Sequence, residues 1–508
     1  MPITKHLNRF DITDFTGGLN DVLGDSTLLQ IGQAPQFRLM TDYEPIAGGG
    51  ARAWYKGDVM VTTGIASPST ELPMGIFARG NVANRAGGAD GVDVLLATID
   101  NVDFKSRLYR MDGSNNEVVW KLVWRDAAGA TSAGFIVSEF GMFVDDAGTP
   151  VTTYLWVKRT SPSAGVYEVP YLSTNTFPTA GVVNNYSYQG PIATSQARVM
   201  MCEGGKLHYT NVGVLTGAAA NTLRINPNDV EATIGLLMER APADLLIGLQ
   251  GSPWYEINGD VSSASTPVRS LGDDHHIRQH YQKGCRVPGG IAFIEPGGRI
   301  YITDGQNFKS ISDSIARFPG VGGVIAPGQL AFLNDYLFAP GGRVFSFRTN
   351  SWHTSTLLTT SAFHHAVQSG RVYMTNCTAT PAPKILRLYE GTDSSIDRMS
   401  TGIIQTLPFR DPTGRNVRIR EVQILAQTYT SSGFAVSLLD STGATVSTDT
   451  VTGVTGRGQV TLRFPNTEDE YLSVKVTPSA TNGTSEAPTI ECLSIFFGPN
   501  NAIQNAAS

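Results

Sequence analysis

The sequence predicts an all-β chain, with an N-terminal assembly arm, a β-propeller-like array and a C-terminal β-sandwich. The main observation is a recurring block, a glycine followed by small, apolar and aromatic residues, that is typical of a turn entering a strand. The block stands at Gly165, Gly205, Gly251, Gly298, Gly342 and Gly370. Successive glycines are 40, 46, 47, 44 and 28 residues apart. A period in the forties with several strands per unit is typical of a propeller. With the group around Arg107 the chain has about seven such units, so we expect about six to eight blades, with seven as the central value.

The array is expected between residues 61 and 395, where runs of β-branched and aromatic residues come in groups. Three such runs are 92–99, 106–111 and 117–124. The one stretch with helical spacing is 229–240, in which four aliphatic side chains can share a face. These are Val230, Ile234, Leu236 and Leu237. We therefore predict a helix inserted between strands at that point.

A second observation is a change of pattern near residue 396. From there to 498 the glycine block disappears, and apolar residues alternate with polar ones, as Val417 and Ile419 do around Arg418. About seven short strands in roughly 100 residues, split by Ser-Gly, Thr-Gly and Pro-Asn turns, are typical of a β-sandwich. The tail at 499–508 is small and polar, with no pattern that forms a core.

The third observation is that residues 1–60 carry apolar residues without enough apolar neighbours to bury them locally. Such residues need a partner surface, either the chain's own propeller or an adjacent subunit. We expect an assembly arm that reaches a neighbouring copy; the alternative is a segment that closes the chain's own last blade. We expect a left-handed backbone at the two glycines. The candidate assembly residues are Phe10, Ile12, Phe15, Gly17, Gly18 and Leu19.

Composition excludes several classes of protein. The 508 residues include 16% charged and 41% hydrophobic residues, a balance opposite to that of disordered chains. No apolar run approaches the ~18 residues of a membrane helix, and no secretory signal follows the first residues, so we expect synthesis in a cytoplasm. The dispersed cysteines indicate thiols rather than a disulfide framework. They are Cys202, Cys285, Cys377 and Cys492.

The strongest candidate for a metal site is Asp273-Asp274-His275-His276 with His280. His276 and His280 can share a helix face, but the glutamate of the zinc-peptidase pattern is missing, and we interpret the segment as a solvated loop. His364 and His365 are adjacent, so in a strand they point to opposite faces, one packed and one wet.

Other catalytic patterns are weaker. No nucleophile motif or phosphate-binding loop is present, whereas a glycosidase-like carboxylate pair stays open because its separation is set in space. We therefore expect no enzymatic activity, no cofactor and no metal. The basic residues after the glycines either form a ring around a channel or pair locally at blade edges, and we favour local pairing. They are Lys206, Arg299, Arg343 and Arg371.

Two blocks resemble a known family. The first runs Phe15-Thr16-Gly17-Gly18-Leu19-Asn20, followed by a Gln-rich linker with Gln30, Gln33 and Gln36 and by Arg52 and Lys56-Gly57. It resembles the opening of tail-tube (nozzle) proteins of short-tailed, podovirus-like bacteriophages. The run from Leu407-Pro408-Phe409 through Arg418 to Val422 is similar to the β-sandwich that ends many such chains.

The resemblance implies a structural virion protein without catalytic activity. It implies a homo-oligomeric ring, usually a hexamer, below the portal and adaptor proteins and near the tail fibres. The ring forms the lower part of the DNA-ejection channel, in a virion tail made in the host bacterial cytoplasm. Each chain carries a net charge of −6, so six copies carry −36 (6 × −6), which resists adhesion of passing DNA rather than binding it.

Three other functions remain open at this stage. A tail-fibre or receptor-binding protein would share the β-rich composition, but it would usually form trimers with a repetitive stalk. A propeller-type glycan-active enzyme would need a carboxylate or histidine cluster on one face of the propeller. A secreted lectin is disfavoured, because it would need a signal peptide.

Overall fold

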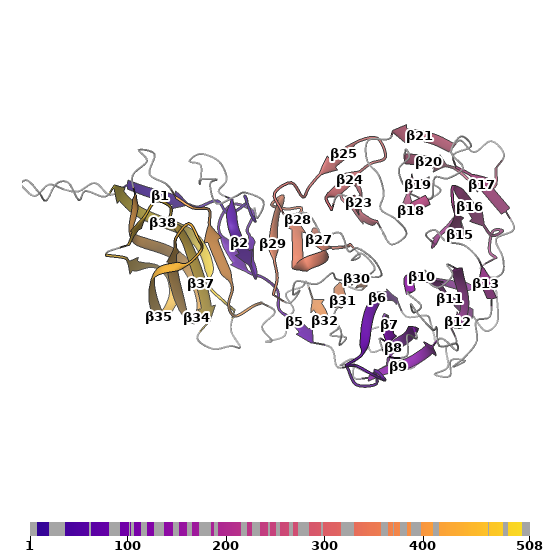
Figure 1. Cartoon of the computed structure of the whole chain (residues 1–508), viewed down its shortest axis with the longest axis horizontal. Helices are drawn as coiled ribbons and strands as arrows, with labels where there is room; N and C mark the ends of the chain where they lie inside the picture. Colours follow the sequence, from indigo (N-terminus) through magenta and orange to yellow (C-terminus); the bar gives the residue numbers. More distant parts are fainter. Residues whose placement is uncertain are drawn as a thin grey trace, which may run out of the picture.

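The computed structural model of the chain shows a ring of small sheets beside a second β domain (Figure 1). The structure describes residues 8–499 with internal gaps. The gaps are 20–35, 60–61, 81–91, 101, 103–105, 113–118, 126–136, 146–151, 160–164, 172–183, 187–191, 215–220, 226–233, 242–243, 250–253, 264–267, 273–283, 296–297, 316–329, 357–363, 369, 376–383, 388–397, 410–415, 466 and 481–485.

The ring is a β-propeller with seven four-stranded antiparallel blades in the described part of the chain. Blade 1 consists of β6 (Glu71–Gly80), β7 (Val92–Asp100), β8 (Ser106–Asp112) and β9 (Val119–Arg125). Blade 2 consists of β10 (Val137–Asp145), β11 (Thr152–Arg159), β12 (Gly165–Tyr171) and β13 (Asn184–Tyr186). Blade 3 consists of β14 (Ile192–Ser195), β15 (Arg198–Glu203), β16 (Lys206–Tyr209) and β17 (Asn221–Arg224).

The remaining blades follow in the same strand order. Blade 4 consists of β18 (Ile234–Ala241), β19 (Asp244–Leu249), β20 (Trp254–Asn258) and β21 (Val268–Gly272). Blade 5 consists of β22 (Cys285–Val287), β23 (Gly290–Ile294), β24 (Ile300–Thr303) and β25 (Phe308–Ser310). Blade 6 consists of β26 (Ala331–Leu333), β27 (Tyr336–Ala339), the 3-10 turn η1 (Pro340–Gly342), β28 (Arg343–Ser346) and β29 (Ser351–Thr354). Blade 7 consists of β30 (His364–Gln368), β31 (Arg371–Thr375), β32 (Lys384–Arg387) and β5 (Gly57–Val59).

Blade 7 closes the ring with a strand from the N-terminal part of the chain. β5 pairs antiparallel with β32, with Gly57 opposite Leu386 and Val59 opposite Lys384. This explains the short last step of the glycine period: Gly370 precedes the second strand of its blade, whereas the earlier glycines stand at or shortly before third strands. The third strand of blade 7 begins at Lys384, 41 residues (384 minus 343) after the third strand of blade 6.

The propeller core lies between neighbouring blades. The first strands of most successive blades contact one another around the ring, so the first strands are the innermost. One cluster joins Ile76 of blade 1 to Tyr373 of blade 7 and seals the closure. An inner strand with both faces covered can carry apolar residues on both faces, as β18 (Ile234–Ala241) does.

The predicted helix at 229–240 is wrong: residues 234–241 form the inner strand β18, and 229–233 lie outside the described residues. Ile234 and Leu237 pack toward blade 3, and Leu236 packs toward blade 5. A β-bulge between Ile234 and Leu236 shifts the alternation by one residue. Because β18 is buried on both faces and contains a bulge, its apolar residues have a spacing that is typical of a helix.

The second domain is a two-layer β-sandwich. Its strands are β1 (Asn8–Ile12), β2 (Phe37–Thr41), β3 (Tyr43–Pro45), β4 (Ala51–Ala53), β33 (Ile403–Thr406), β34 (Val417–Leu439), β35 (Thr445–Arg463), β36 (Glu468–Asp469), β37 (Ser473–Ala480) and β38 (Thr489–Pro499). One layer has the order β1, β38, the first half of β34 and the second half of β35. The other has the order β2, β33, β37, the second half of β34 and the first half of β35.

The expectation of about seven short strands is corrected by two long strands that pass through both layers. β34 has 23 residues and β35 has 19. The Ser-Gly and Thr-Gly pairs at Gly433 and Gly453 are not turns, because both glycines lie inside continuous strands where the register shifts. Gly453 has φ 75°. Glycine with a positive φ occurs both in β-bulges and in tight turns, so a Thr-Gly pair in the sequence does not distinguish the two.

The N-terminal segment belongs to both domains. β1, β2, β3 and β4 lie in or against the sandwich, while β5 completes the propeller. β2 also forms a parallel bridge to β29 of blade 6, between Thr41 and Thr354, so the sandwich and that blade are hydrogen-bonded to each other. Figure 1 shows β2 between the two domains.

Candidate functional site at the domain junction

Two of the candidate assembly residues, Phe10 and Ile12, lie in β1, which is the edge strand of one sandwich layer. Ile12 is completely buried in the sandwich core, and Phe10 packs edge-on against Phe409 with ring centroids 5.7 Å apart. Phe15 is also completely buried, and its ring stacks on Phe37 with centroids 5.1 Å apart and planes 3° apart. These contacts attach the start of the chain to its own C-terminal domain.

The glycine pair that follows turns the chain onto the propeller. Gly18 has φ 59°, and its amide donates to the carbonyl oxygen of Phe15 at 3.1 Å. A Cβ on Gly18 would lie 2.5 Å from Cβ of Ser351 in β29. A left-handed backbone is expected at both glycines and is found at Gly18 alone of the two; Gly18 also lies too close to blade 6 for a side chain.

Leu19 enters the core between blades 5 and 6, where it packs in one cluster with Trp352. Its amide donates to the carbonyl oxygen of Trp352 at 2.7 Å, and the amide of Phe37 donates to the carbonyl oxygen of Gly18 at 2.8 Å. Phe15 and Leu19, four residues apart, therefore lie in the cores of two different domains. The block Phe15-Thr16-Gly17-Gly18-Leu19 therefore connects the sandwich core to the propeller core.

This arrangement corrects the expectation that the apolar residues reach a neighbouring copy. Ile12, Phe15 and Leu19 are 0%, 0% and 1% exposed within one chain. Apolar neighbours are scarce in the sequence around these residues because their packing partners come from distant parts of the chain. The alternative of a segment that closes its own last blade describes β5, a different part of the first 60 residues.

A buried charged cluster lies at the same junction. Oε1 of Glu44 in β3 accepts hydrogen bonds from Nε of Arg52 at 2.7 Å and from Nη1 of Arg398 at 3.2 Å. Its Oε2 accepts one from the Tyr336 hydroxyl in β27 at 2.5 Å. Arg398 also stacks over the ring of Tyr55, 4.3 Å from its centroid. One carboxylate thus joins blade 6, the N-terminal strands and the chain that enters the sandwich.

The charges in this cluster are held in place electrostatically. Burial would lower the pKa of Arg52, but the adjacent Glu44 carboxylate outweighs it and raises that pKa. Burial raises the pKa of Tyr336, and the negative charge of Glu44 raises it further. Both residues therefore keep their protons over the physiological pH range, which is the state that the hydrogen bonds require.

His353 in β29 is the unusual member of the junction. It is completely buried, and burial lowers its pKa to about 4, although the charge of Glu44 opposes this. Neither ring nitrogen has a hydrogen-bond partner among the described residues. Its ring lies edge-on to Trp54, with centroids 4.3 Å apart. The sequence does not single out Glu44 or His353, because both stand in mixed polar and apolar runs, 41–45 and 351–355.

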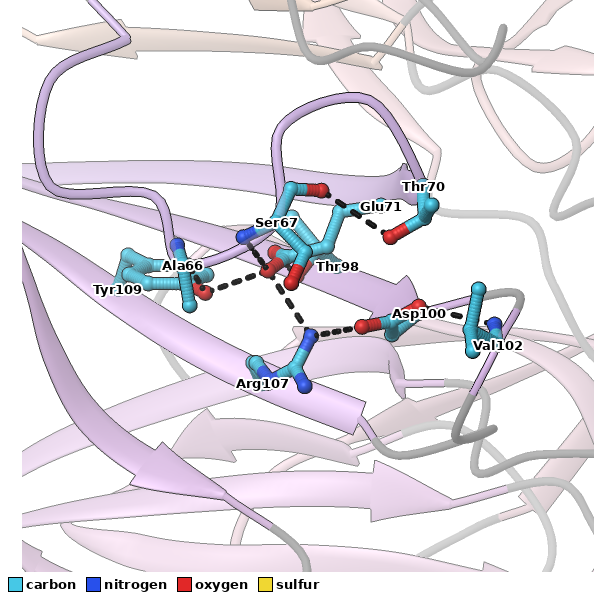
Figure 2. A network of polar contacts seen from close by, with 9 residues as sticks. All are labelled: Ala66, Ser67, Thr70, Glu71, Thr98, Asp100, Val102, Arg107 and Tyr109. Atoms are coloured by element: carbon cyan, nitrogen blue, oxygen red, sulfur yellow. Dashed lines mark hydrogen bonds and ion pairs between the residues drawn. The ribbon is translucent and has the colours of Figure 1, made fainter.

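Blade 1 contains a carboxylate pair, the arrangement that a glycosidase would use (Figure 2). Nη1 of Arg107 lies 2.9 Å from Oε1 of Glu71 and 2.6 Å from Oδ2 of Asp100. Glu71 also accepts hydrogen bonds from the hydroxyls of Tyr109 at 2.7 Å and Thr98 at 2.5 Å. Glu71 is completely buried, so protein donors occupy its oxygens.

Asp100 lacks the raised pKa of a glycosidase acid, which must hold a proton near neutral pH. Burial alone would raise the pKa of Asp100, but hydrogen bonds from the Val102 amide and from Arg107 lower it overall. We interpret the pair as a structural network that attaches the loop before β6 to its blade.

The remaining sequence candidates divide between described and undescribed residues. The segment 273–283, with His276 and His280, lies outside the described residues, as does Cys377. His365 is buried and packs near Phe338, with ring centroids 6.1 Å apart, as expected for one residue of the pair. In the described part of the chain, no three histidine, cysteine or acidic side chains form a metal-binding group, and no helix has the length and hydropathy that crossing a bilayer requires.

The basic residues after the recurring glycines do not surround the axis of the propeller. Lys206, Arg299 and Arg343 stand at or just before third strands, and Arg371 begins a second strand, whereas the first strands are innermost. Arg299 pairs with Asp313 at 2.6 Å, which confirms local pairing for this residue. Cys202, Cys285 and Cys492 are thiols and not half-cystines.

Among the solved structures to which the chain is similar are the three below. No protein-family model and no curated protein matches the chain. YCF48 bound to D1 peptide is 10% identical, covers 67% of this chain and 97% of its own, and has a TM-score of 0.37. Sqt1 of Saccharomyces cerevisiae is 13% identical, covers 63% and 97%, and has a TM-score of 0.32. An exo-β-1,3-galactanase from Phanerochaete chrysosporium with galactose is 8% identical, covers 87% and 100%, and has a TM-score of 0.30. At these values the likenesses carry no functional argument.

Proposed function

We propose that the protein is a structural subunit of the tail nozzle of a short-tailed bacteriophage. In this proposal, copies form a ring, a hexamer, below the portal and adaptor, and the ring encloses the lower part of the DNA-ejection channel. The resemblance of the block around Phe15-Thr16-Gly17-Gly18-Leu19 motivates the family. The proposal treats the chain as a building block without catalytic activity.

The observation that carries the proposal is the position of that block. Phe15 is buried in the sandwich core and Leu19 in the propeller core, so the block fixes one domain against the other. The carboxylate of Glu44 adds a buried electrostatic contact at the same place. A ring subunit must present its two contact surfaces at a fixed angle, because small changes in that angle prevent closure. A rigid two-domain unit meets this need.

Imaging of the purified protein in negative stain tests the proposal, with sedimentation to count the copies. We expect hollow rings with six-fold symmetry. A stable trimer would favour a tail-fibre or receptor-binding protein, and a monomer at all concentrations would contradict the proposal. A matched control is Asp335→Asn, which removes an exposed ion pair with Arg348 in the turn before Tyr336 but leaves the buried contacts of Glu44 in place, and it should leave the rings intact.

A further inference from the structure

One layer of the sandwich ends on each side in a strand whose outer side is unpaired among the described residues. Its order is β1, β38, β34 and β35, and among the described residues no further strand pairs with the outer side of β1 or of β35. Figure 1 shows β1 and β35 on opposite sides of the domain. Edge strands with exposed backbone groups are templates for pairing with another chain, and natural proteins usually protect them.

The backbone of β35 shows which of its groups point outward. The amide of Phe464 donates to the carbonyl oxygen of Arg420, whose strand is β34, at 2.8 Å, so it points inward. The amide of Arg463 donates instead to the Asp449 carboxylate at 2.9 Å, so it points away from β34. Because the direction alternates along a strand, the amides and carbonyls at 457, 459 and 461 also point outward.

These outward groups lie in an exposed part of the strand. Arg457, Gln459 and Thr461 are all exposed, while Val460 and Leu462 are buried in the core. The Asp449 carboxylate accepts a hydrogen bond from one outward amide, that of Arg463. The outward amides at 457, 459 and 461 are therefore left for hydrogen bonds to another chain. The span 457–461 contains neither proline nor lysine, two residues that commonly block edge pairing.

The opposite edge, β1, has a matching length. β1 spans Asn8–Ile12, five residues, as does the span 457–461. Side chains of Arg9 and Asp11 are 54% and 41% exposed and face outward, whereas Ile12 faces the core. A β1 strand placed beside β35 would therefore keep its apolar side on the core side of the layer.

We propose that β1 of one copy adds to the β35 edge (457–461) of the next copy, so that the sandwich layers form a continuous sheet around the ring. The inference deepens the proposed function and rests on it, because it names the contact that closes the ring. A second copy is the occupant because the two edges belong to the same layer, so their contact is head-to-tail, and repetition of such a contact gives a ring when the rotation between copies closes. Pairing of β35 with another β35 would instead stop at a dimer.

A proline substitution tests the β35 edge. Thr461→Pro removes one outward amide and, at an edge position, is compatible with the strand. We expect loss of rings, with a monomer whose circular dichroism spectrum is unchanged. The matched control Thr461→Val keeps the amide and a β-branched side chain, and it should form rings like the natural chain. Rings formed by the proline variant would overturn the inference.

Disulfide cross-linking tests the identity of the partner strand and does not depend on the proline variant folding. One tagged chain carries Arg9→Cys, and a differently tagged chain carries Thr461→Cys; further pairs use Asp11→Cys and Gln459→Cys. Opposite side chains on one face of a sheet are close enough for a disulfide. We expect oxidation to link the two tags in the mixture for at least one pair, and neither chain to link to itself.

The outcomes separate this inference from the proposed function. Rings that form without any link between these strands would refute the strand contact and leave the nozzle proposal standing. Links within the Thr461→Cys sample alone would show pairing of β35 with itself and overturn the inference. A natural chain that forms no rings would refute both.

Discussion

The hydroxyl of Tyr336 donates a hydrogen bond to Glu44 at 2.5 Å, although the two residues are 292 positions apart in the sequence. Tyr336 lies in blade 6 and Glu44 in β3, so this contact links the propeller to the strands that cover the sandwich. The same carboxylate binds Arg52 and Arg398. One acidic side chain thus adds a buried contact to the Phe15–Leu19 block and the β2–β29 bridge, which also hold the two domains together.

Glu44→Gln should destabilise the protein by about 3 kcal/mol, because removing one member of a buried ion pair leaves an uncompensated charge. Arg398 is the charge at issue, since its side chain is only 6% exposed. Chemical denaturation measures the loss. Asp335→Asn is the control: its pair with Arg348 is exposed, and its removal should change stability by less than about 1 kcal/mol. Equal effects of the two substitutions would contradict the prediction.

His353 should make stability depend on pH. Its pKa is about 4 in the folded protein, below the ordinary value of 6.5, so the unfolded chain binds the proton more readily. Stability therefore falls as pH drops from 6.5 to about 4, by up to roughly 3 kcal/mol, and this contribution is constant above that window. Unfolding measured across this window for the natural chain and for His353→Phe checks the sign, since the variant should lose that part of the slope.

Gly18→Ala should destabilise the junction by about 2 kcal/mol or more. The substitution adds a side chain at φ 59° and places Cβ 2.5 Å from Cβ of Ser351. Gly443→Ala is the matched control, because Gly443 also has a positive φ, 83°, but nothing lies within 4 Å of its added Cβ. Thermal unfolding of both variants separates the backbone strain from the clash; a control that loses as much stability would remove the role assigned to the contact with β29.

Deletion of residues 1–19 should lower the melting temperature and abolish rings together, because it removes β1, Phe15 and Leu19 from two cores. Loss of one buried phenylalanine alone costs about 3–5 kcal/mol. Deletion of residues 1–7 leaves β1 in place and should not change stability. An unchanged melting temperature for the longer deletion would show that these cores close without the segment.

The propeller could be predicted from the sequence because its pattern is local and repeated. Glycines such as Gly205 and Gly342 mark the turn before the third strand of a blade, and their spacing follows from the size of a blade. The N-terminal contacts could not be predicted in the same way. Phe10 pairs with Ile495 across nearly the whole chain, and no local pattern encodes that partner.

The buried cluster around Glu44 could not be predicted from the sequence for a related physical reason. Sequence spacing does not show that Glu44, Tyr336 and Arg398 meet, since each comes from a different segment. The helix expected around Leu236 failed because a strand covered on both faces loses the alternation that identifies strands.

The pairing of β5 with β32 also sets the order of events during synthesis. Val59 and Lys384 are 325 residues apart (384 minus 59), so the ring cannot close until the ribosome has passed blade 7. At about 5–20 residues per second, that delay is roughly 16–65 s. During this time β5 and the inner face of blade 1 wait without their partner. A circular permutant that joins residue 508 to residue 1 and begins after β5 would place β5 behind β32 in the order of synthesis, so β5 would no longer wait for its partner. Its yield of folded protein in cell-free translation should rise relative to that of the natural order.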